Sequence, residues 1–204
     1  TGCAIYVVHL SSLAALDATL GVPGLPQSGT GQTALFTGEN AAAIFGRHFG
    51  PWVPTPLRAL LSERNVVSRV KAAGGSVAFA NGYPEEVFAE GRKARDPLRA
   101  GPPIVALGAG VMNRHTPELM RGDAIASEIV NEGWRVHLHR TQLPVITPRQ
   151  AGNNLARISA QHDLTLFAHY SPDQAGHTHT LAAGIESLQR VDEMLAGVLE
   201  VRGK

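Results

Sequence analysis

The sequence is short of the features that assign a protein to a class at first sight. It has one cysteine, Cys3, which excludes an intramolecular disulfide and is compatible with a reducing cytosol, so we expect a cytoplasmic protein. It has no apolar run of about 20 residues and no charged leader ahead of an apolar core. From the sequence we therefore expect neither a membrane span nor a signal peptide.

Charge of one sign is also in little excess. The formal net charge is +1, and lysine and arginine are scattered along the chain. This pattern offers no electrostatic footprint for nucleic acid or an anionic membrane surface, so we expect neither partner, and a bound anion must be held locally. The chain also has no Gly-x-x-x-x-Gly-Lys-Ser/Thr loop, which argues against a nucleoside triphosphatase of that type.

The pattern of short apolar runs and longer helical segments indicates the fold class. With 204 residues, 44% of them hydrophobic, the chain can bury one sizeable core. Apolar runs predict strands at Cys3–Val8, Ser76–Ala80 and Leu164–His169. Helical spacing and end signals predict helices at Pro56–Lys71, from Thr147 to Ile158, and at Leu181–Val198. Strands that alternate with helices predict an α/β sandwich around a mainly parallel sheet.

One segment, residues 85 to 146, has a different character. Glu90–Gly101 is charged and then rich in proline and glycine, and Leu107–Val111 is rich in glycine. Arg121-Gly122-Asp123 interrupts a helical pattern that runs from Glu118 to Glu132. We interpret 85–146 as an insertion or cap-like segment, and 1–84 with 147–204 as the core. Such an insertion can carry substrate contacts or serve as a spacer.

A cluster of carboxylate and imidazole groups lies at residues 170 to 180. Asp173, His177 and His179 fall within seven residues, and this mixture of ligands suits Mn or Zn better than Ca or Mg. Pro172 and Gly176 predict a rigid turn there rather than the middle of a helix. Because aspartate and histidine are also common on polar surface loops, an ordinary exposed loop is the competing interpretation.

A second candidate segment is the glycine-rich loop from Leu25 to Gly38. It places Ser28 and Thr30 beside glycines, and Gly29 and Gly31 would let backbone amides approach an anion closely. Serine, threonine and glycine are equally typical of a helix-capping turn, which is the structural alternative.

Together the two segments resemble enzymes of the alkaline phosphatase superfamily. Pro172-Asp-x-x-Gly-His-Thr178 is similar to the metal-binding stretch of cofactor-independent phosphoglycerate mutases. Ser28-x-x-Gly31 is similar to the nucleophile loop of those enzymes and of phosphopentomutases, and the length of Ser28 to Gly38 matches the nucleophile segment of sulfatases. The chain most resembles a bacterial branch of metalloenzymes in which a Leu-Pro-Gln-Ser-x-Thr-Gly-Gln-Thr loop precedes a Phe-Ala-Asn-x-Tyr-Pro segment, here Phe79–Pro84. The resemblance covers most of residues 16 to 200.

This resemblance implies a fold, a reaction and roles for individual residues. The fold would be a three-layer α/β/α sandwich, and the reaction a phosphoryl transfer to or from a small phosphorylated substrate, assisted by two divalent ions, Mn or Zn. Ser28 would be the nucleophile and a metal ligand, with Thr30 as the reserve candidate. Asp173 and His177 would share one ion, and His179 would be a further ligand, a residue that supports the ligands, a substrate contact or simply exposed.

Three more polar residues are candidate substrate contacts. Asn40 follows the Thr-Gly end of the loop, His48 lies in a Gly-Arg-His-Phe-Gly run, and Asn81 ends a predicted strand, where open α/β sheets tend to bind ligands. Turn formation by the asparagines and surface exposure of the histidine are the competing interpretations.

Two motifs of the resembled family are missing. We find no Asp-Gly after the first apolar run and no Asp-His-Gly on a late strand. Either the chain is a fragment of a longer protein, which we expect, or its metal site has degenerated. The second case would leave a non-catalytic metal-binding or scaffold protein that retains the fold.

Overall fold

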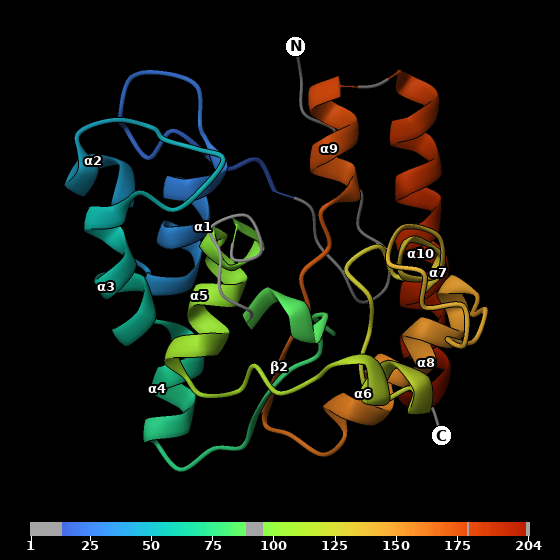
Figure 1. Cartoon of the computed structure of the whole chain (residues 1–204). Coiled ribbons are helices and arrows are strands. Elements are labelled where there is room, and N and C mark those ends of the chain that lie inside the picture. The colour runs from blue at the N-terminus through green and yellow to red at the C-terminus, as the bar shows by residue number, and fades with distance from the viewer. Residues whose placement is uncertain (1–13, 89–95, 179, 203–204) are drawn as a thin grey trace.

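The protein is a mixed α/β structure, here a computed structural model that describes residues 14–88, 96–178 and 180–202. The strand expected at Cys3–Val8 lies outside these residues. The described elements, shown in Figure 1, are α1 (Ser28–Thr37), α2 (Ala41–Phe45), α3 (Thr55–Glu63), α4 (Val66–Ala72), β1 (Val77–Phe79), the 3-10 helices η1 (Glu85–Phe88) and η2 (Asp96–Arg99), α5 (Gly101–Gly108), α6 (Thr116–Arg121), α7 (Glu132–His137), α8 (Pro148–Ser159), β2 (Leu164–Leu166), α9 (Ser171–Thr178) and α10 (Leu181–Arg202).

The two described strands form a parallel pair, as predicted. Val77 pairs with Leu164 and Phe79 with Leu166. Both strands fall inside the predicted runs, and the second is shorter than predicted because the ladder continues through a side chain instead of the backbone. Asn81 receives a hydrogen bond from the Ala168 amide and donates one to its carbonyl, each 2.8 Å long.

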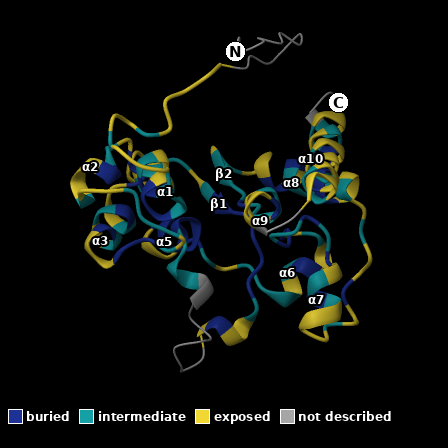
Figure 2. Cartoon of the chain, turned by 90° about the horizontal axis from the view of Figure 1, so that it is seen from above, coloured by how far each residue is buried: buried dark blue, intermediate teal, exposed yellow. Residues whose placement is uncertain are grey.

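Helices cover both faces of this strand pair. Alternate residues of a strand point to opposite faces, and Phe79 accordingly packs in a cluster with Leu57 of α3 and Val105 of α5. Ala78 packs in a second cluster with Met194 of α10. Helices α1 to α5 therefore lie on one side of the strands, and α6 to α8 with α10 on the other (Figures 1 and 2).

A side-chain clamp fixes the beginning of the strand pair. The carboxylate of Asp163 accepts hydrogen bonds from the backbone amide and the hydroxyl of Ser76, both 2.8 Å long. In return, the Asp163 amide donates to the Ser76 hydroxyl over 3.0 Å. The two residues precede β1 and β2, so the clamp holds the register in which the strands pair.

The helix expected at Pro56–Lys71 is two helices, α3 and α4, and this expectation is therefore corrected. Asn65 separates them: its side-chain oxygen caps α4 by accepting from the Ser68 amide over 2.8 Å. Its amide nitrogen donates to the Leu61 carbonyl at the end of α3 over 2.8 Å. Asn65 is fully buried, so the apolar spacing continues through a residue that ends one helix and begins the next.

The other two long helices are confirmed. Thr147 caps α8 by accepting from the Gln150 amide, and Gln150 in turn accepts from the Thr147 amide, a reciprocal capping box. Helix α10 runs from Leu181 to Arg202 and packs along α8. Of its predicted apolar stripe Met194 is buried, whereas Leu188 and Leu195 are exposed.

The segment interpreted as an insertion contributes directly to the core. Ile104, Val105 and Ala106 of α5 are buried in the cluster that contains β1. Ile125 forms a parallel bridge with Asn81 and exchanges backbone hydrogen bonds with Ala80 and Gly82. The helical pattern expected from Glu118 to Glu132 is corrected: only its two ends fall in helices, α6 and α7, and residues 122–131 between them are irregular.

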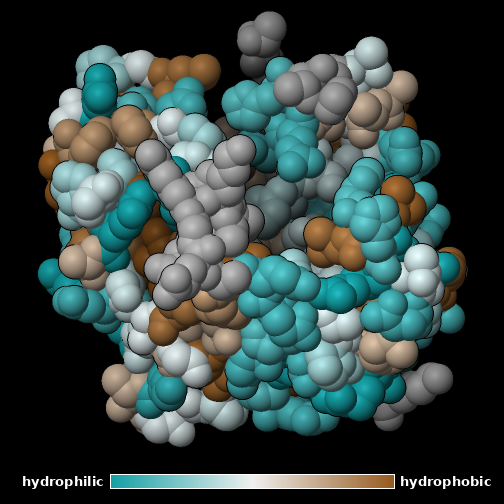
Figure 3. Space-filling view, in the orientation of Figure 1, coloured by the Kyte–Doolittle hydropathy of each residue, from teal (hydrophilic) through white to brown (hydrophobic). Residues whose placement is uncertain are grey.

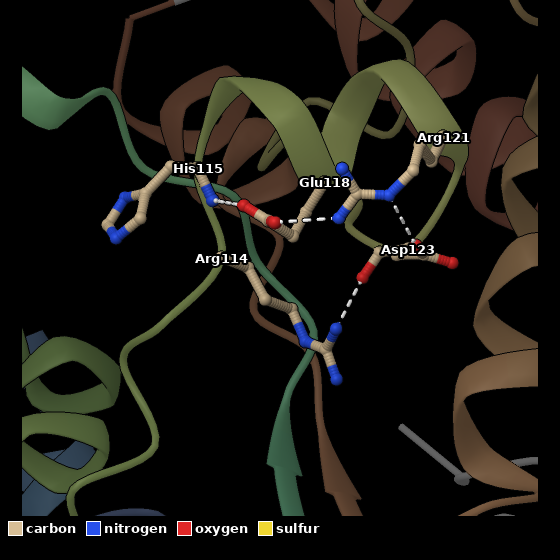
Figure 4. A network of polar contacts seen from close by, with 5 residues as sticks. All are labelled: Arg114, His115, Glu118, Arg121 and Asp123. Atoms are coloured by element: carbon tan, nitrogen blue, oxygen red, sulfur yellow. Dashed lines mark hydrogen bonds and ion pairs between the residues drawn. The ribbon is translucent and has the colours of Figure 1, made fainter.

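A polar network fixes α6 beside the strands (Figure 4). The Glu118 carboxylate accepts from the His115 amide over 2.8 Å and from Arg121 over 2.8 Å, while Arg121 also reaches Asp123 over 3.1 Å. Arg114 donates to the Asp123 carbonyl over 2.7 Å. Hydrogen bonding from the His115 amide lowers the pKa of Glu118, so this carboxylate stays charged at neutral pH. Gly122, with a φ of 76°, ends the helix.

None of the helices in the described ranges combines the length and the apolar character needed to cross a bilayer.

Candidate functional site

A cavity of about 530 Å³ opens between the two helical sides of the molecule. The surface in Figure 3 is hollowed between these sides. The cavity is lined by residues from α1, η1, α7, α9 and the loops before α3, after β1, before α5, before α7 and after β2: Ser28, Gln32, Pro51, Trp52, Gly82, Tyr83, Pro84, Val87, Ala100, Ser127, Trp134, Tyr170, Asp173 and Gln174. It brings together two of the residues singled out from the sequence, Ser28 and Asp173.

Ser28 is the first residue of α1 and is partly exposed in the cavity wall. The preceding Gln27 is extended and makes no side-chain cap, so the helix begins without the usual hydroxyl cap. Gly29 is required by packing, since a Cβ there would overlap the Trp52 carbonyl oxygen. Gly31 has open space around it. The close approach at Gly29 therefore serves a protein contact rather than an anion.

Thr30 is placed differently from Ser28. It is 1% exposed, and its amide donates to the Phe49 carbonyl over 3.0 Å. Its hydroxyl accepts from the Phe49 amide over 3.2 Å and lies 3.3 Å from the Gln27 carbonyl oxygen. These bonds tie the first turn of α1 to the loop that carries Trp52. Of the two candidate nucleophiles, only Ser28 lines the cavity.

Asp173 and His177 lie on α9, a helix where a rigid turn was expected. Pro172 falls in the first turn of α9, where proline is tolerated because the first amides of a helix have no acceptor within it. Asp173 Oδ1 and His177 Nε2 are 3.7 Å apart, one helical turn from each other, and both side chains are mostly exposed. Asp173 lines the cavity, and His177 lies one turn further along the helix.

The two donors on α9 could bind one of the two ions that the resemblance implies. Two donors that bind one ion at about 2.0–2.2 Å stand at most about 4 Å apart, so a separation of 3.7 Å is compatible with a shared ion. However, no three His, Cys, Asp or Glu side chains gather around one point within residues 14–88, 96–178 and 180–202. The third predicted ligand on this segment, His179, lies outside the described residues. A second ion finds no comparable donor group in the part of the chain described.

Two candidate substrate contacts lie away from the cavity. Asn40 caps α2 by accepting from the Ala43 amide over 3.1 Å, and its amide nitrogen donates to the Leu20 carbonyl over 2.8 Å. His48 Nε2 lies 3.0 Å from the Val22 carbonyl oxygen. His48 lines a separate, open cavity of about 530 Å³ with Arg47 and Phe49. The structure therefore does not bring Asn40 or His48 to Ser28.

Asn81 is 1% exposed, and both polar atoms of its side chain bond to Ala168. The neighbouring Gly82 is part of the cavity lining, whereas Asn81 is not. Its position at the end of a strand is the one expected, but its side chain extends the strand pairing and is not presented to the cavity.

Aromatic side chains that the sequence reasoning did not single out form much of the cavity wall. Trp52, Tyr83, Trp134 and Tyr170 all line it. Burial raises the pKa of Tyr83, with the neighbouring phenol of Tyr170 adding to the effect, and burial likewise raises the pKa of Tyr170. Both phenols are therefore neutral at physiological pH. No single stretch of sequence reveals this wall, because its members come from four separate parts of the chain.

His169, next to this wall, is a further residue that the sequence reasoning missed. Its Nδ1 lies 2.7 Å from the carbonyl oxygen of Ser127, a cavity-lining residue, and must donate to it. Burial lowers the pKa of His169, so its ring is neutral and Nε2 carries the lone pair at neutral pH. Within the described residues that buried Nε2 has no hydrogen-bond partner.

Comparisons of the chain with protein-family models, curated proteins and solved structures give no match.

Proposed function

We propose that this chain carries out metal-dependent phosphoryl transfer of the phosphatase, phosphodiesterase or phosphomutase type, with Ser28 as the nucleophile. The observation that carries the proposal is that Ser28 and Asp173, far apart in the sequence, line one cavity. Ser28 and Asp173 belong to the two sequence segments whose resemblance to known enzymes suggested this reaction. The three-layer sandwich of the alkaline phosphatase superfamily is part of this proposal, and helices on both faces of a parallel strand pair support it.

The position of Ser28 suits an attack on phosphorus. Its hydroxyl stands at the amino end of α1, where the helix dipole favours a negatively charged group. In the proposed step a bond forms between the serine oxygen and phosphorus while the bond to the leaving oxygen breaks. Water or a second alcohol then displaces the serine, which distinguishes a hydrolase from a mutase.

Asp173 and His177 are the residues that would hold a divalent ion, Mn or Zn, with remaining ligands from outside the described residues. Such an ion would lower the pKa of the attacking hydroxyl and neutralise charge on the phosphoryl oxygens. Thr30, which is buried and bonded to Phe49, would hold the helix that presents Ser28.

The test is turnover of p-nitrophenyl phosphate by the full chain with added Mn²⁺ or Zn²⁺. We expect Ser28→Ala to abolish turnover, whereas Ser159→Ala, a change at the far end of α8, leaves it unchanged. Wild-type turnover that persists in Ser28→Ala contradicts the proposal.

A second candidate function is a metal-binding or scaffold role without catalysis. The observation that favours it is the incomplete donor set around Asp173 and His177 in the described residues. Metal binding that depends on Asp173, in a protein that turns over no phosphate ester, would support this role.

A further inference from the structure

The cavity beside Ser28 concentrates the larger aromatic residues of the chain. The chain has only two tryptophans and three tyrosines, and both tryptophans and two of the tyrosines line this one cavity. Trp52 precedes α3, Tyr83 follows β1, Trp134 lies in α7 and Tyr170 precedes α9. A chance distribution of surface aromatics would not gather side chains from four separate segments at one place.

Packing holds three of these rings in fixed positions. Tyr83 is 8% exposed and packs on Phe79, with ring centroids 5.9 Å apart. Trp134 is 6% exposed and packs with Leu119 and Leu143. The Arg99 guanidinium lies over the Trp52 ring, 5.7 Å from its centroid. Because the rings are already ordered, a ligand that stacks on them loses little affinity to their immobilisation.

The described lining of the cavity carries little charge. Asp173 is the single ionisable acid or base among the described lining residues other than the phenols, which are neutral. The other polar groups of the lining include the hydroxyls of Ser28 and Ser127 and the side-chain amide of Gln32. A phosphoryl group beside Ser28 would be repelled by the Asp173 carboxylate unless the ion of the proposed function neutralises it, so the anionic group is assigned to Ser28 and that ion, whereas the aromatic wall offers contacts to an uncharged body.

We infer that this cavity binds a phosphate ester of a planar aromatic ring, with the ring against the wall of Trp52, Tyr83, Trp134 and Tyr170. A phenyl ring and a nucleobase share the chemistry that this wall recognises, since both present a flat π-face to an aromatic side chain. The inference rests on the proposed function, because the phosphoryl end of the ligand is assigned to Ser28 and the α9 donors.

The test compares phenylphosphonate with cyclohexylphosphonate, which differ in the planarity of the ring and have no leaving group. Both tryptophans of the chain stand in the wall, so quenching of intrinsic fluorescence reports binding without turnover. In the full chain with Mn²⁺ or Zn²⁺ we expect phenylphosphonate to bind about tenfold more tightly, the size of one stacking contact. Adenosine monophosphate and phenyl phosphate, added as competitors, distinguish a nucleobase from a simple aryl ligand.

Variants locate the effect in the wall. We expect Trp52→Leu to remove the preference for the phenyl ring, with Trp134 as the remaining reporter. Phe45→Leu, an aromatic change in α2 outside the lining of this cavity, keeps the preference. Far-ultraviolet circular dichroism verifies that each variant is folded, and the wild-type comparison of the two phosphonates needs no variant.

The outcomes separate this inference from the proposed function. Equal affinity for the two phosphonates, in a protein whose Ser28-dependent turnover is present, overturns the aromatic site and leaves the function standing. A preference for the phenyl ring without any turnover retains the site and overturns the function. If the protein shows neither a preference for phenylphosphonate nor any turnover, both the aromatic site and the proposed function are overturned.

Discussion

Asp173 and His177 stand one turn apart on α9 with their donor atoms 3.7 Å from each other, and Asp173 reaches the cavity that also contains Ser28. This geometry makes α9 the element on which a metal would be held. The side chains of Asp173 and His177 are largely exposed, so we expect substitutions at these positions to change metal binding with little effect on folding.

We therefore expect Asp173→Asn and His177→Gln each to weaken Mn²⁺ or Zn²⁺ binding by about 100-fold or more, since each removes a direct donor where even outer neighbours contribute about 10–100-fold. Isothermal titration calorimetry measures the affinity. His137→Gln, at the exposed end of α7, is the matched control and keeps wild-type affinity. Unchanged binding in both α9 variants would remove the metal site from this helix.

The two glycines of α1 make a matched pair for substitution. Gly29→Ala forces a Cβ into the Trp52 carbonyl oxygen, so we expect a loss of about 1–3 kcal/mol in the free energy of unfolding. Gly31→Ala meets no atom within 4 Å and should stabilise the helix by about 0.5–1 kcal/mol. Urea denaturation measures both. If Gly31→Ala abolishes turnover while the protein remains stable, Gly31 serves anion approach after all.

Thr30 should matter for stability and not for chemistry. Thr30→Val leaves the partly buried Phe49 amide without the hydroxyl that accepts from it, which costs about 1–3 kcal/mol. Thr30→Ser keeps the hydroxyl and should lose less. With p-nitrophenyl phosphate, both variants should retain turnover per folded molecule. If Thr30→Val loses turnover per folded molecule while Thr30→Ser keeps it, Thr30 is instead a reacting group.

The clamp between Ser76 and Asp163 predicts a pH dependence of stability. Hydrogen bonds from the backbone amide and hydroxyl of Ser76 lower the pKa of Asp163 in the folded state. The stabilisation is therefore present above the unfolded pKa of about 4, and it is lost as the pH falls through the lower folded pKa. We expect Asp163→Asn to lower the urea midpoint at pH 7 and to converge with wild type in acid. Asp192→Asn on α10 is the surface control, and a gap that persists unchanged into acid contradicts the mechanism.

Local signals in the sequence predicted some elements well. The cap at Thr147 followed by Pro148 predicted α8, and the apolar runs predicted β1 and β2, because these signals lie within a few residues of the structure they specify. The break at Asn65 was missed because its apolar neighbours continue the helical spacing, and only the bonds of its side chain end α3 and begin α4.

The candidate site was predictable only in part. The hydroxyl at Ser28 and the carboxylate at Asp173 were found from motifs, and they do line one cavity. Asn81 read locally as a turn residue or a ligand contact, whereas its bonds to Ala168 depend on how two distant strands pair. The aromatic wall depends in the same way on tertiary structure. Contacts between segments that are distant in the sequence produce no periodic pattern of residues from which they could be predicted.

The strand pair is held at both ends by side chains, by Asp163 where it begins and by Asn81 where it stops. Tyr83 and Tyr170 follow at equal distances beyond the last backbone pair, Phe79 with Leu166. Sliding one strand by a single residue would break both sets of side-chain hydrogen bonds and shift one tyrosine relative to the other. These side-chain hydrogen bonds thus fix the strand register, so a change as far from the cavity as Asp163 can alter the placement of the two tyrosines that line it.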